Sequence, residues 1–205
     1  MPNPATPDLA NLAEQPAIDP KAILRRSLLA ARQRLAEQPA QAARMNAQLG
    51  ARLAQVLAQR QPQCVGFYWP VAGEFDARDV LTVWLALDAS RRAALPVVIA
   101  PRAPLVFHAW QPSATMKKGR YGIPVPAQER VVVPDLLVIP CVGFDADRYR
   151  LGYGGGYYDR TLADWPRGRA PATIGVAFES AKCDALPRGE FDLPLGAIVT
   201  ESAVY

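Results

Sequence analysis

The chain has 205 residues, and half of them are hydrophobic, which is enough for one sizeable core and predicts a single domain. A single histidine excludes most histidine-based catalytic triads and multi-histidine metal sites, and three dispersed cysteines argue against a zinc site or a disulfide framework. The net charge of +4 is mild, and the basic residues are scattered without an aromatic-basic RNA-binding motif, so we expect no nucleic-acid partner.

The chain lacks the hydrophobic signals that direct proteins to or across a membrane. No apolar run reaches the length of a membrane span, and the N-terminus has no basic-then-apolar signal peptide. The dispersed cysteines fit reduced thiols. We therefore expect a cytoplasmic protein without a membrane partner, and a monomer.

The N-terminal part of the chain predicts a tail followed by two helices. Residues 1–19 contain four prolines, many alanines and little periodicity, which predicts a disordered tail ahead of one domain at 20–205. Pro20 suits a first helical turn, and apolar residues recur on one face of a predicted helix from 21 to about 37. Pro39 begins a second predicted helix, which runs to about residue 60.

The remainder alternates short apolar runs with helical patterns. We expect Asp76 to be the N-cap of a helix to about residue 89, and residues 111–134 to form a structured loop. Because the predicted strands are apolar on both faces, a mostly parallel sheet with helices on both sides is expected, with ligands at the carboxyl ends of its strands. The predicted strands are 64–69, 95–100, 105–110, 136–140, 173–178 and 197–200, and a last helix is predicted at 157–165.

A glycine-rich stretch follows the apolar run 136–140 and reads Arg150-Leu151-Gly152-Tyr153-Gly154-Gly155-Gly156-Tyr157-Tyr158-Asp159-Arg160. Four glycines within five positions leave backbone N–H groups free to point at a phosphate, helped by the positive end of the following helix. Arg150 supplies a forked positive charge, and Asp159 supplies the hard oxygen that Mg²⁺ prefers. A bare glycine cluster is more often a simple turn, and no Walker-type Gly-Lys-Ser or Gly-Lys-Thr follows. The flanking residues therefore indicate phosphate binding of another design.

The pattern Arg-Leu-Gly-x-Gly-x-Gly-Tyr-Tyr-Asp resembles the signature of the 5-formyltetrahydrofolate cyclo-ligase family, also called methenyltetrahydrofolate synthetases. The resemblance runs from about residue 21 to 200 and is strongest at 136–160. It implies a three-layer Rossmann-like α/β domain of the NagB/RpiA/CoA transferase-like type, in agreement with the alternating strands and helices. It also implies a ligase of one-carbon metabolism that uses ATP and Mg²⁺ to convert 5-formyltetrahydrofolate into 5,10-methenyltetrahydrofolate, ADP and phosphate.

On the nucleotide side, the resemblance assigns Lys21 and Arg25 to ATP, although two basic residues four apart on a helix are more often a solvated face. It assigns catalytic roles to Arg150 and Tyr153 and a magnesium ligand to Asp159. The second family aspartate corresponds to Gly196, which leaves Asp192 or water as the second ligand. The loop residues implied to bind ATP are Arg150, Leu151, Gly152, Tyr153, Gly154, Gly155, Gly156, Tyr157 and Tyr158.

On the folate side, the resemblance implies contacts from Tyr68, Glu74 and Tyr121. Glu74 follows a strand end, where a carboxylate can accept the N–H donors of a pterin. Tyr121 opens the family-like segment Tyr-Gly-Ile-Pro-Val-Pro, and packing on the pterin or a rigid loop explains it equally well. The glycine-rich loop is implied to contact the folate through Tyr153, Gly154, Gly155, Gly156 and Tyr157.

Two other functions remain open at this point. The first is a cyclo-ligase-like nucleotide-binding protein with a different folate activity or none, because a fold and a nucleotide loop do not fix the acceptor. The second is a nucleotide-dependent binding or regulatory protein, with RNA as its partner, which a salt-dependent gel shift would detect.

Overall fold

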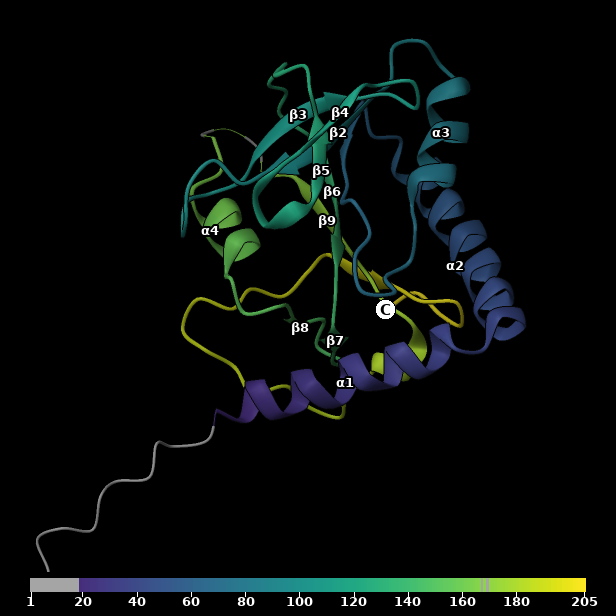
Figure 1. Ribbon diagram of the computed structural model, residues 1–205, viewed down its shortest axis with the longest axis vertical. Coiled ribbons are helices and arrows are strands. Elements are labelled where there is room, and N and C mark those ends of the chain that lie inside the picture. The colour runs from purple at the N-terminus through teal and green to yellow at the C-terminus, as the bar shows by residue number, and fades with distance from the viewer. Residues whose placement is uncertain (1–18, 167, 169) are drawn as a thin grey trace, which may run out of the picture.

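The structure is a computed structural model that describes residues 19–166, 168 and 170–205 (Figure 1). The predicted tail lies outside these residues apart from Asp19, whose side chain caps the first helix by accepting the Lys21 N–H at 2.9 Å. The helices are α1 (Pro20–Ala36), α2 (Pro39–Arg60), α3 (Arg78–Ala86) and α4 (Tyr157–Ala163), with short 3-10 turns η2 (Arg120–Gly122) and η3 (Glu179–Ala181). The strands are β1 (Cys64–Gly66), β2 (Arg92–Val97), β3 (Val106–Trp110), β4 (Met116–Lys118), β5 (Pro124–Pro126), β6 (Leu136–Pro140), β7 (Gly143–Phe144), β8 (Arg150–Leu151), β9 (Ala172–Val176) and β10 (Ala197–Val199).

Six strands form the main sheet in the order β10-β9-β6-β1-β2-β3. All neighbouring pairs are parallel except β2 and β3, so the predicted mostly parallel sheet is confirmed. Side chains of β6 alternate between two core clusters, with Leu136 and Val138 on one face and Leu137 and Ile139 on the other. A strand that is buried on both faces reads as a continuous apolar run in the sequence.

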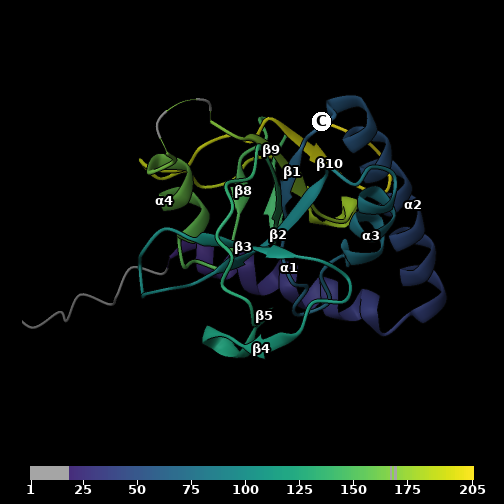
Figure 2. The ribbon, with the colours of Figure 1, turned by 90° about the horizontal axis from the view of Figure 1, so that it is seen from above.

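Helices cover both faces of this sheet. Seen from above, α4 lies on one side of the strands and α2 and α3 lie on the other (Figure 2). Leu53 of α2 and Leu81 of α3 are fully buried in the cluster that includes Val138, whereas Leu162 of α4 packs on the cluster that includes Ile139. The three layers predicted for the domain are therefore present.

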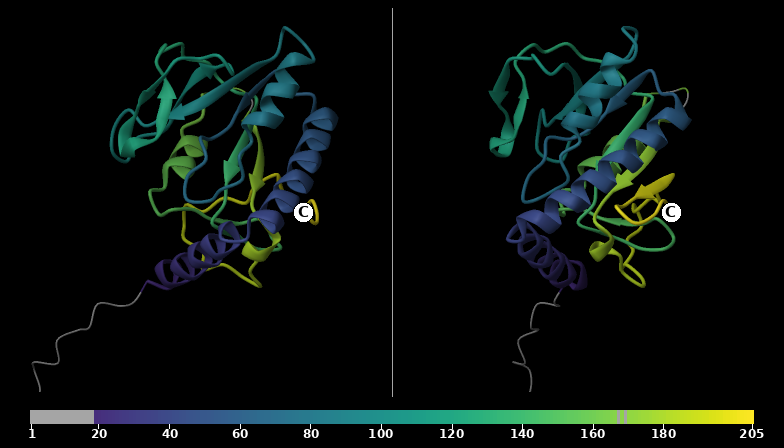
Figure 3. Two further views of the ribbon diagram at one scale, coloured as in Figure 1. Left: turned by 45° about the vertical axis from the view of Figure 1, so that its right-hand side comes forward. Right: turned by 90° about the vertical axis from the view of Figure 1, so that its right-hand side faces the viewer.

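Helix α1 belongs to neither layer. It runs past the end of the sheet at which β6 continues into β7 and β8, and it meets α2 at an angle (Figures 1 and 3). Its buried residue is not apolar but Arg32, so polar contacts hold much of this helix against the domain. Nowhere in the described part of the chain is a helix long and apolar enough to cross a bilayer.

Several boundaries differ from the sequence predictions. Strand β2 is shifted to Arg92–Val97 from the predicted 95–100, because it pairs in parallel with β1 from Arg92 onward. The expected loop 111–134 contains a hairpin of β4 and β5, and the β7–β8 hairpin separates β6 from the glycine-rich loop. The N-cap residue of α3 is Ala77 and not the predicted Asp76. Asp76, one position earlier, still caps the helix, because its side chain accepts the N–H of Arg78 at 3.0 Å.

Other parts of the chain occupy the two edges of the main sheet. Beside β3, the Ala109 N–H donates to the Arg130 carbonyl at 2.8 Å, and the Val132 N–H donates to the Phe107 carbonyl at 2.9 Å. Beside β10, Ile198 and Tyr205 exchange both backbone hydrogen bonds, at 3.1 and 2.9 Å.

Candidate functional site

The site lies where the strand order changes direction. Strand β1 has β2 on one side and β6 on the other, so the connections leaving β1 and β6 diverge. In open α/β sheets, ligands bind outside the carboxyl ends of the strands at such a point. Residues 67–77 leave β1 at this point, and residues 141–156 follow β6. Helix α1 contacts the same region, because its side chains hydrogen-bond to both Cys141 and Gly152.

The glycine-rich loop has a backbone that needs glycine at two positions. Gly154 has φ +92° and Gly156 has φ +62°, conformations that residues with a side chain rarely adopt. A Cβ on Gly156 would also lie 2.8 Å from Arg160 Nη1. Arg160 folds back over the loop, donates to the Gly155 carbonyl and stacks 5.3 Å from the Tyr157 ring centroid. Its Nε is buried and meets no acceptor within the described residues.

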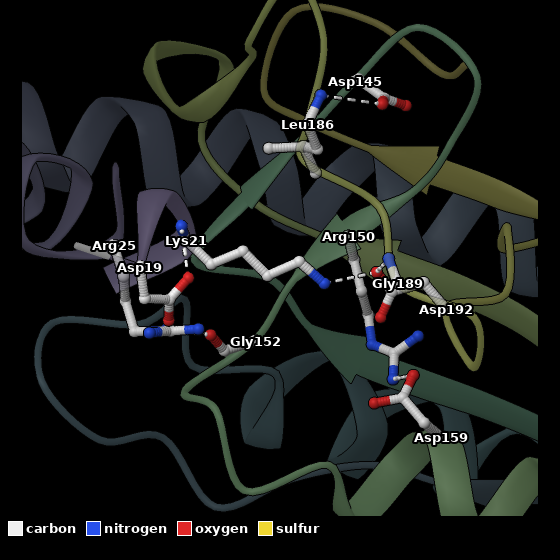
Figure 4. A network of polar contacts seen from close by, with 10 residues as sticks. All are labelled: Asp19, Lys21, Arg25, Asp145, Arg150, Gly152, Asp159, Leu186, Gly189 and Asp192. Carbon is white, nitrogen blue, oxygen red and sulfur yellow. Dashed lines mark hydrogen bonds and ion pairs between the residues drawn. The ribbon is translucent and has the colours of Figure 1, made fainter. Parts of the chain in front are cut away.

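Besides Arg160, three further cations lie around this loop. From α1, Lys21 Nζ lies 2.5 Å from Asp192 Oδ2, and Arg25 Nε donates to the Gly152 carbonyl at 2.7 Å. Arg150 Nη2 donates to Asp159 Oδ1 at 2.6 Å, with the Arg150 side chain only 6% exposed. Figure 4 shows Arg150 between the carboxylates of Asp159 and Asp192. The predicted nucleotide residues are thus brought together, and each cation has a partner in the protein.

The Asp192 carboxylate is the partner of Lys21. Partial burial alone would raise its pKa, but the Lys21 ammonium and the Gly189 N–H, which donates to Oδ2 at 2.7 Å, hold the pKa of Asp192 below its usual value. The Gly196 position lies at the start of β10, where the nearest atoms to a Cβ would all belong to Thr173. Among the described residues, no group of three or more His, Cys, Asp or Glu side chains could hold a metal ion.

A second cluster lies on the side of β1. The Tyr153 hydroxyl, from the glycine-rich loop, donates to Glu74 Oε1 at 2.9 Å, and Arg32 Nη1 donates to the same hydroxyl at 3.0 Å. The Glu74 side chain is 4% exposed, and burial raises the pKa of its carboxyl, against the lowering effects of the Val71 N–H, the Tyr153 hydroxyl and the Arg32 charge. The loop predicted to bind the nucleotide therefore touches the carboxylate predicted to bind the pterin.

Arg32 is the residue of this cluster that the sequence prediction missed. Its side chain also donates to the Cys141 carbonyl at 2.5 Å. The available signal was its spacing, because Arg32 follows Arg25 by seven residues and Lys21 by eleven, which returns it to the same helix face. Cys141 itself is no nucleophile, since burial raises the pKa of its thiol to about 12.

The remaining predicted residues are divided between the core and the surface. Leu151 and Tyr158 are packed in or against the core, and Tyr68 is buried with its hydroxyl on the Phe75 carbonyl at 2.8 Å. Tyr121 is 66% exposed, and its hydroxyl lies 2.7 Å from that of Tyr157. This contact joins the β4–β5 hairpin to the start of α4.

The sequence and the fold are both similar to those of known enzymes. The model of the 5-formyltetrahydrofolate cyclo-ligase family matches residues 17–201. The 5-formyltetrahydrofolate cyclo-ligase of Escherichia coli K12 is 36% identical over 140 residues, which are 65% of this chain and 75% of that protein. The Haemophilus influenzae protein of the same name is 31% identical over 147 residues, 68% of this chain and 76% of that protein.

Two solved structures share the fold. The NMR structure of Aquifex aeolicus 5,10-methenyltetrahydrofolate synthetase has a TM-score of 0.73 and 28% identity, and the match covers 90% of this chain and 91% of that one. The 5,10-methenyltetrahydrofolate synthetase of Mycoplasma pneumoniae has a TM-score of 0.72 and 25% identity, with 89% and 99% covered.

Proposed function

Because the chain belongs to the 5-formyltetrahydrofolate cyclo-ligase family of enzymes, we propose that it converts 5-formyltetrahydrofolate into 5,10-methenyltetrahydrofolate, using ATP and Mg²⁺ and releasing ADP and phosphate. The observation that carries this proposal is the contact between Tyr153 of the glycine-rich loop and Glu74 at the end of β1. A reaction between a nucleotide and a folate needs the two binding regions to adjoin, and this hydrogen bond joins them.

The residues around the loop fit a nucleoside triphosphate. Lys21, Arg25 and Arg150 offer three positive charges, and the loop between them has few side chains to keep phosphate oxygens away. The buried Arg160 Nε has no acceptor within the described residues, which suits a donor that awaits an anionic group. In this proposal, the Lys21 ammonium leaves Asp192 and binds phosphate oxygens instead. Arg25 binds phosphate oxygens while it still donates to the Gly152 carbonyl.

Mg²⁺ also fits, with few protein ligands. Asp159 stands on the first turn of α4 directly after the loop, and Arg150 holds one of its two oxygens. Mg²⁺ commonly takes only one or two carboxylates and completes its shell with water and phosphate oxygens, so Asp159 can serve without a three-residue cluster.

On the folate side, Glu74 would accept N–H donors of the pterin, and Tyr153 would keep that carboxylate turned toward the loop. When bound, ATP supplies a phosphoryl group that makes the formyl oxygen a good leaving group while N10 attacks the formyl carbon. The protein's own part is to align the two reactants, neutralise phosphate charge and exclude water, which requires few proton-transfer side chains. That requirement suits a chain with one histidine.

Product absorbance tests the proposal directly. The purified protein is incubated with 5-formyltetrahydrofolate, and the rise of the methenyl chromophore is followed with ATP and Mg²⁺ together and with either one left out. We expect product only when both are present. Hydrolysis of ATP without methenyl product would indicate a related enzyme with a different acceptor, and product formation without ATP would contradict the proposed reaction.

A further inference from the structure

Arg32 stands at the junction of the three segments that build the site. From α1, its Nη2 donates to the Cys141 carbonyl just after β6, and its Nη1 donates to the Tyr153 hydroxyl in the glycine-rich loop. The same Nη1 lies 3.9 Å from Glu74 Oε1, in the segment that follows β1. Its side chain is only 7% exposed, so these contacts are shielded from competing water.

The arrangement depends on the shape of a guanidinium group. Its planar fork directs one Nη to the carbonyl and the other to the phenol at the same time. The Tyr153 hydroxyl in turn donates its own proton to Glu74, so two hydrogen bonds connect Arg32 to Glu74 through Tyr153. Lys21 and Arg25 share this helix face but reach Asp192 and Gly152 on the nucleotide side.

We propose that Arg32 is a positioning residue for folate recognition, which holds the Glu74 carboxylate in place through Tyr153 and sets a positive charge 3.9 Å from it. This inference rests on the proposed function, and it adds that different parts of α1 serve different substrates. The first turns of the helix serve the nucleotide, and the buried Arg32, about two turns further on, serves the pterin.

The charge of Arg32 matters because burial favours the neutral form of the Glu74 carboxyl. Burial is the largest influence and raises the pKa of the Glu74 carboxyl, while the Val71 N–H, the Tyr153 hydroxyl and Arg32 oppose it. Arg32 is the cation that acts on this carboxyl, and without it the pKa of Glu74 should rise further. The titratable groups that face Glu74 are Tyr68 after β1, Cys141 after β6, Tyr153 in the loop, Tyr158 on α4 and Arg32 on α1. Burial raises the pKa of the three tyrosines and the cysteine well above neutrality, so none of these four titrates together with Glu74.

Steady-state kinetics of Arg32→Gln and Arg32→Lys test the inference, with Arg34→Gln as a matched loss of charge on the exposed side of α1. Arg32→Gln should raise KM for 5-formyltetrahydrofolate by about 10- to 100-fold, as expected for a lost charge-assisted contact. KM for ATP should stay within about twofold of the parent. An unfolded fraction would lower the apparent kcat and leave KM unchanged, so the split between the two KM values separates positioning from folding.

The pH profile separates the charge of Arg32 from its shape. Glu74 must be ionised to accept pterin N–H groups, so the acid limb of kcat/KM for the folate should move to higher pH in Arg32→Gln. Arg32→Lys keeps a positive charge, so its acid limb should stay near that of the parent. Its KM for the folate should still rise, because one ammonium cannot replace the two-pronged guanidinium, but by less than in Arg32→Gln. Arg34→Gln should match the parent in both readouts.

Three results would overturn the inference in a parent that makes methenyl product. They are a larger change in KM for ATP than for the folate in Arg32→Gln, an unshifted acid limb, or the same changes in Arg34→Gln. A parent without methenyl product would instead reject the proposed function, whatever the variants do.

Discussion

The ion pair between Lys21 and Asp192 yields a quantitative prediction for Asp192→Asn. The side chains are 27% and 25% exposed, so the pair is neither fully solvated nor sealed in the core. Asparagine keeps an oxygen that can accept the Gly189 N–H, and it removes only the charge. A Lys21 ammonium left alone would still reach water, which excludes the penalty of a stranded buried charge. We therefore expect a loss of about 1 kcal/mol in the free energy of unfolding, near the upper limit for exposed pairs.

The pH dependence of this loss has a definite sign. The folded pKa of Asp192 is lowered below its usual value, so folding favours the ionised carboxylate. Its contribution to stability is fully present above the unfolded value near 3.8 and is lost as the pH falls through the folded pKa. Urea unfolding of both proteins, followed by tryptophan fluorescence, should give the same difference at pH 7 and pH 5 and a smaller one toward pH 3. An equal difference at all three pH values would refute the assignment of the loss to this ion pair.

ATP binding provides a second test of the pairing between Lys21 and Asp192. Calorimetry with ATP and Mg²⁺ should show that Lys21→Gln weakens ATP binding by about 1–3 kcal/mol, the value of a charge-assisted contact. Asp192→Asn frees the same ammonium and should bind ATP at least as tightly as the parent. If Asp192→Asn instead required more Mg²⁺ for turnover, Asp192 would be a metal ligand and its pairing with Lys21 would be secondary.

Three further predictions concern the carboxylates of Glu74 and Asp159 and the backbone of the glycine-rich loop. Glu74→Gln should raise KM for 5-formyltetrahydrofolate and leave ATP binding nearly intact; calorimetry that found ATP binding lost and folate binding kept would contradict the pterin role. Asp159→Asn should lower turnover by roughly two orders of magnitude or more and raise the Mg²⁺ requirement. A parental Mg²⁺ titration curve for this variant would rule out the metal role. Gly156→Ala places a side chain at φ +62° and 2.8 Å from Arg160 Nη1, so its urea midpoint should fall by the equivalent of about 1–2 kcal/mol. Gly152→Ala, whose Cβ would meet nothing within 4 Å, is the matched control and should unfold like the parent.

Local signals in the sequence predicted the elements that depend on local chemistry. Pro39 suits the first turn of a helix, and α2 begins there and ends at Arg60 as expected. The glycine-rich loop is recognisable from local sequence because its glycines are bracketed by an arginine, tyrosines and an aspartate, which a simple turn does not require. Strand β2 was misplaced because Arg92 and Ala93 have little intrinsic preference for strands, and their place in the sheet is decided by pairing with β1.

The contacts that assemble the site are long-range, and a single sequence carries no local signal for them. Tyr153 and Glu74 are 79 residues apart, and Arg32 is 109 residues from the Cys141 carbonyl. Arg32 looks like one more solvated charge on a helix, since most arginines at such positions face water. The β4–β5 hairpin was equally hidden, because prolines at both ends of β5 remove N–H donors and weaken the pattern of a strand.

The backbone pairing beside β3 and β10 has a consequence for how the protein can meet its own copies. An uncovered sheet edge is a template onto which a strand from another molecule can add, and this is a common route to aggregates. Residues 130–132 and Tyr205 already use hydrogen-bonding groups at the two edges, so little of the sheet remains open for such extension. A strand from another molecule would therefore have to displace these segments before it could extend the main sheet at either edge.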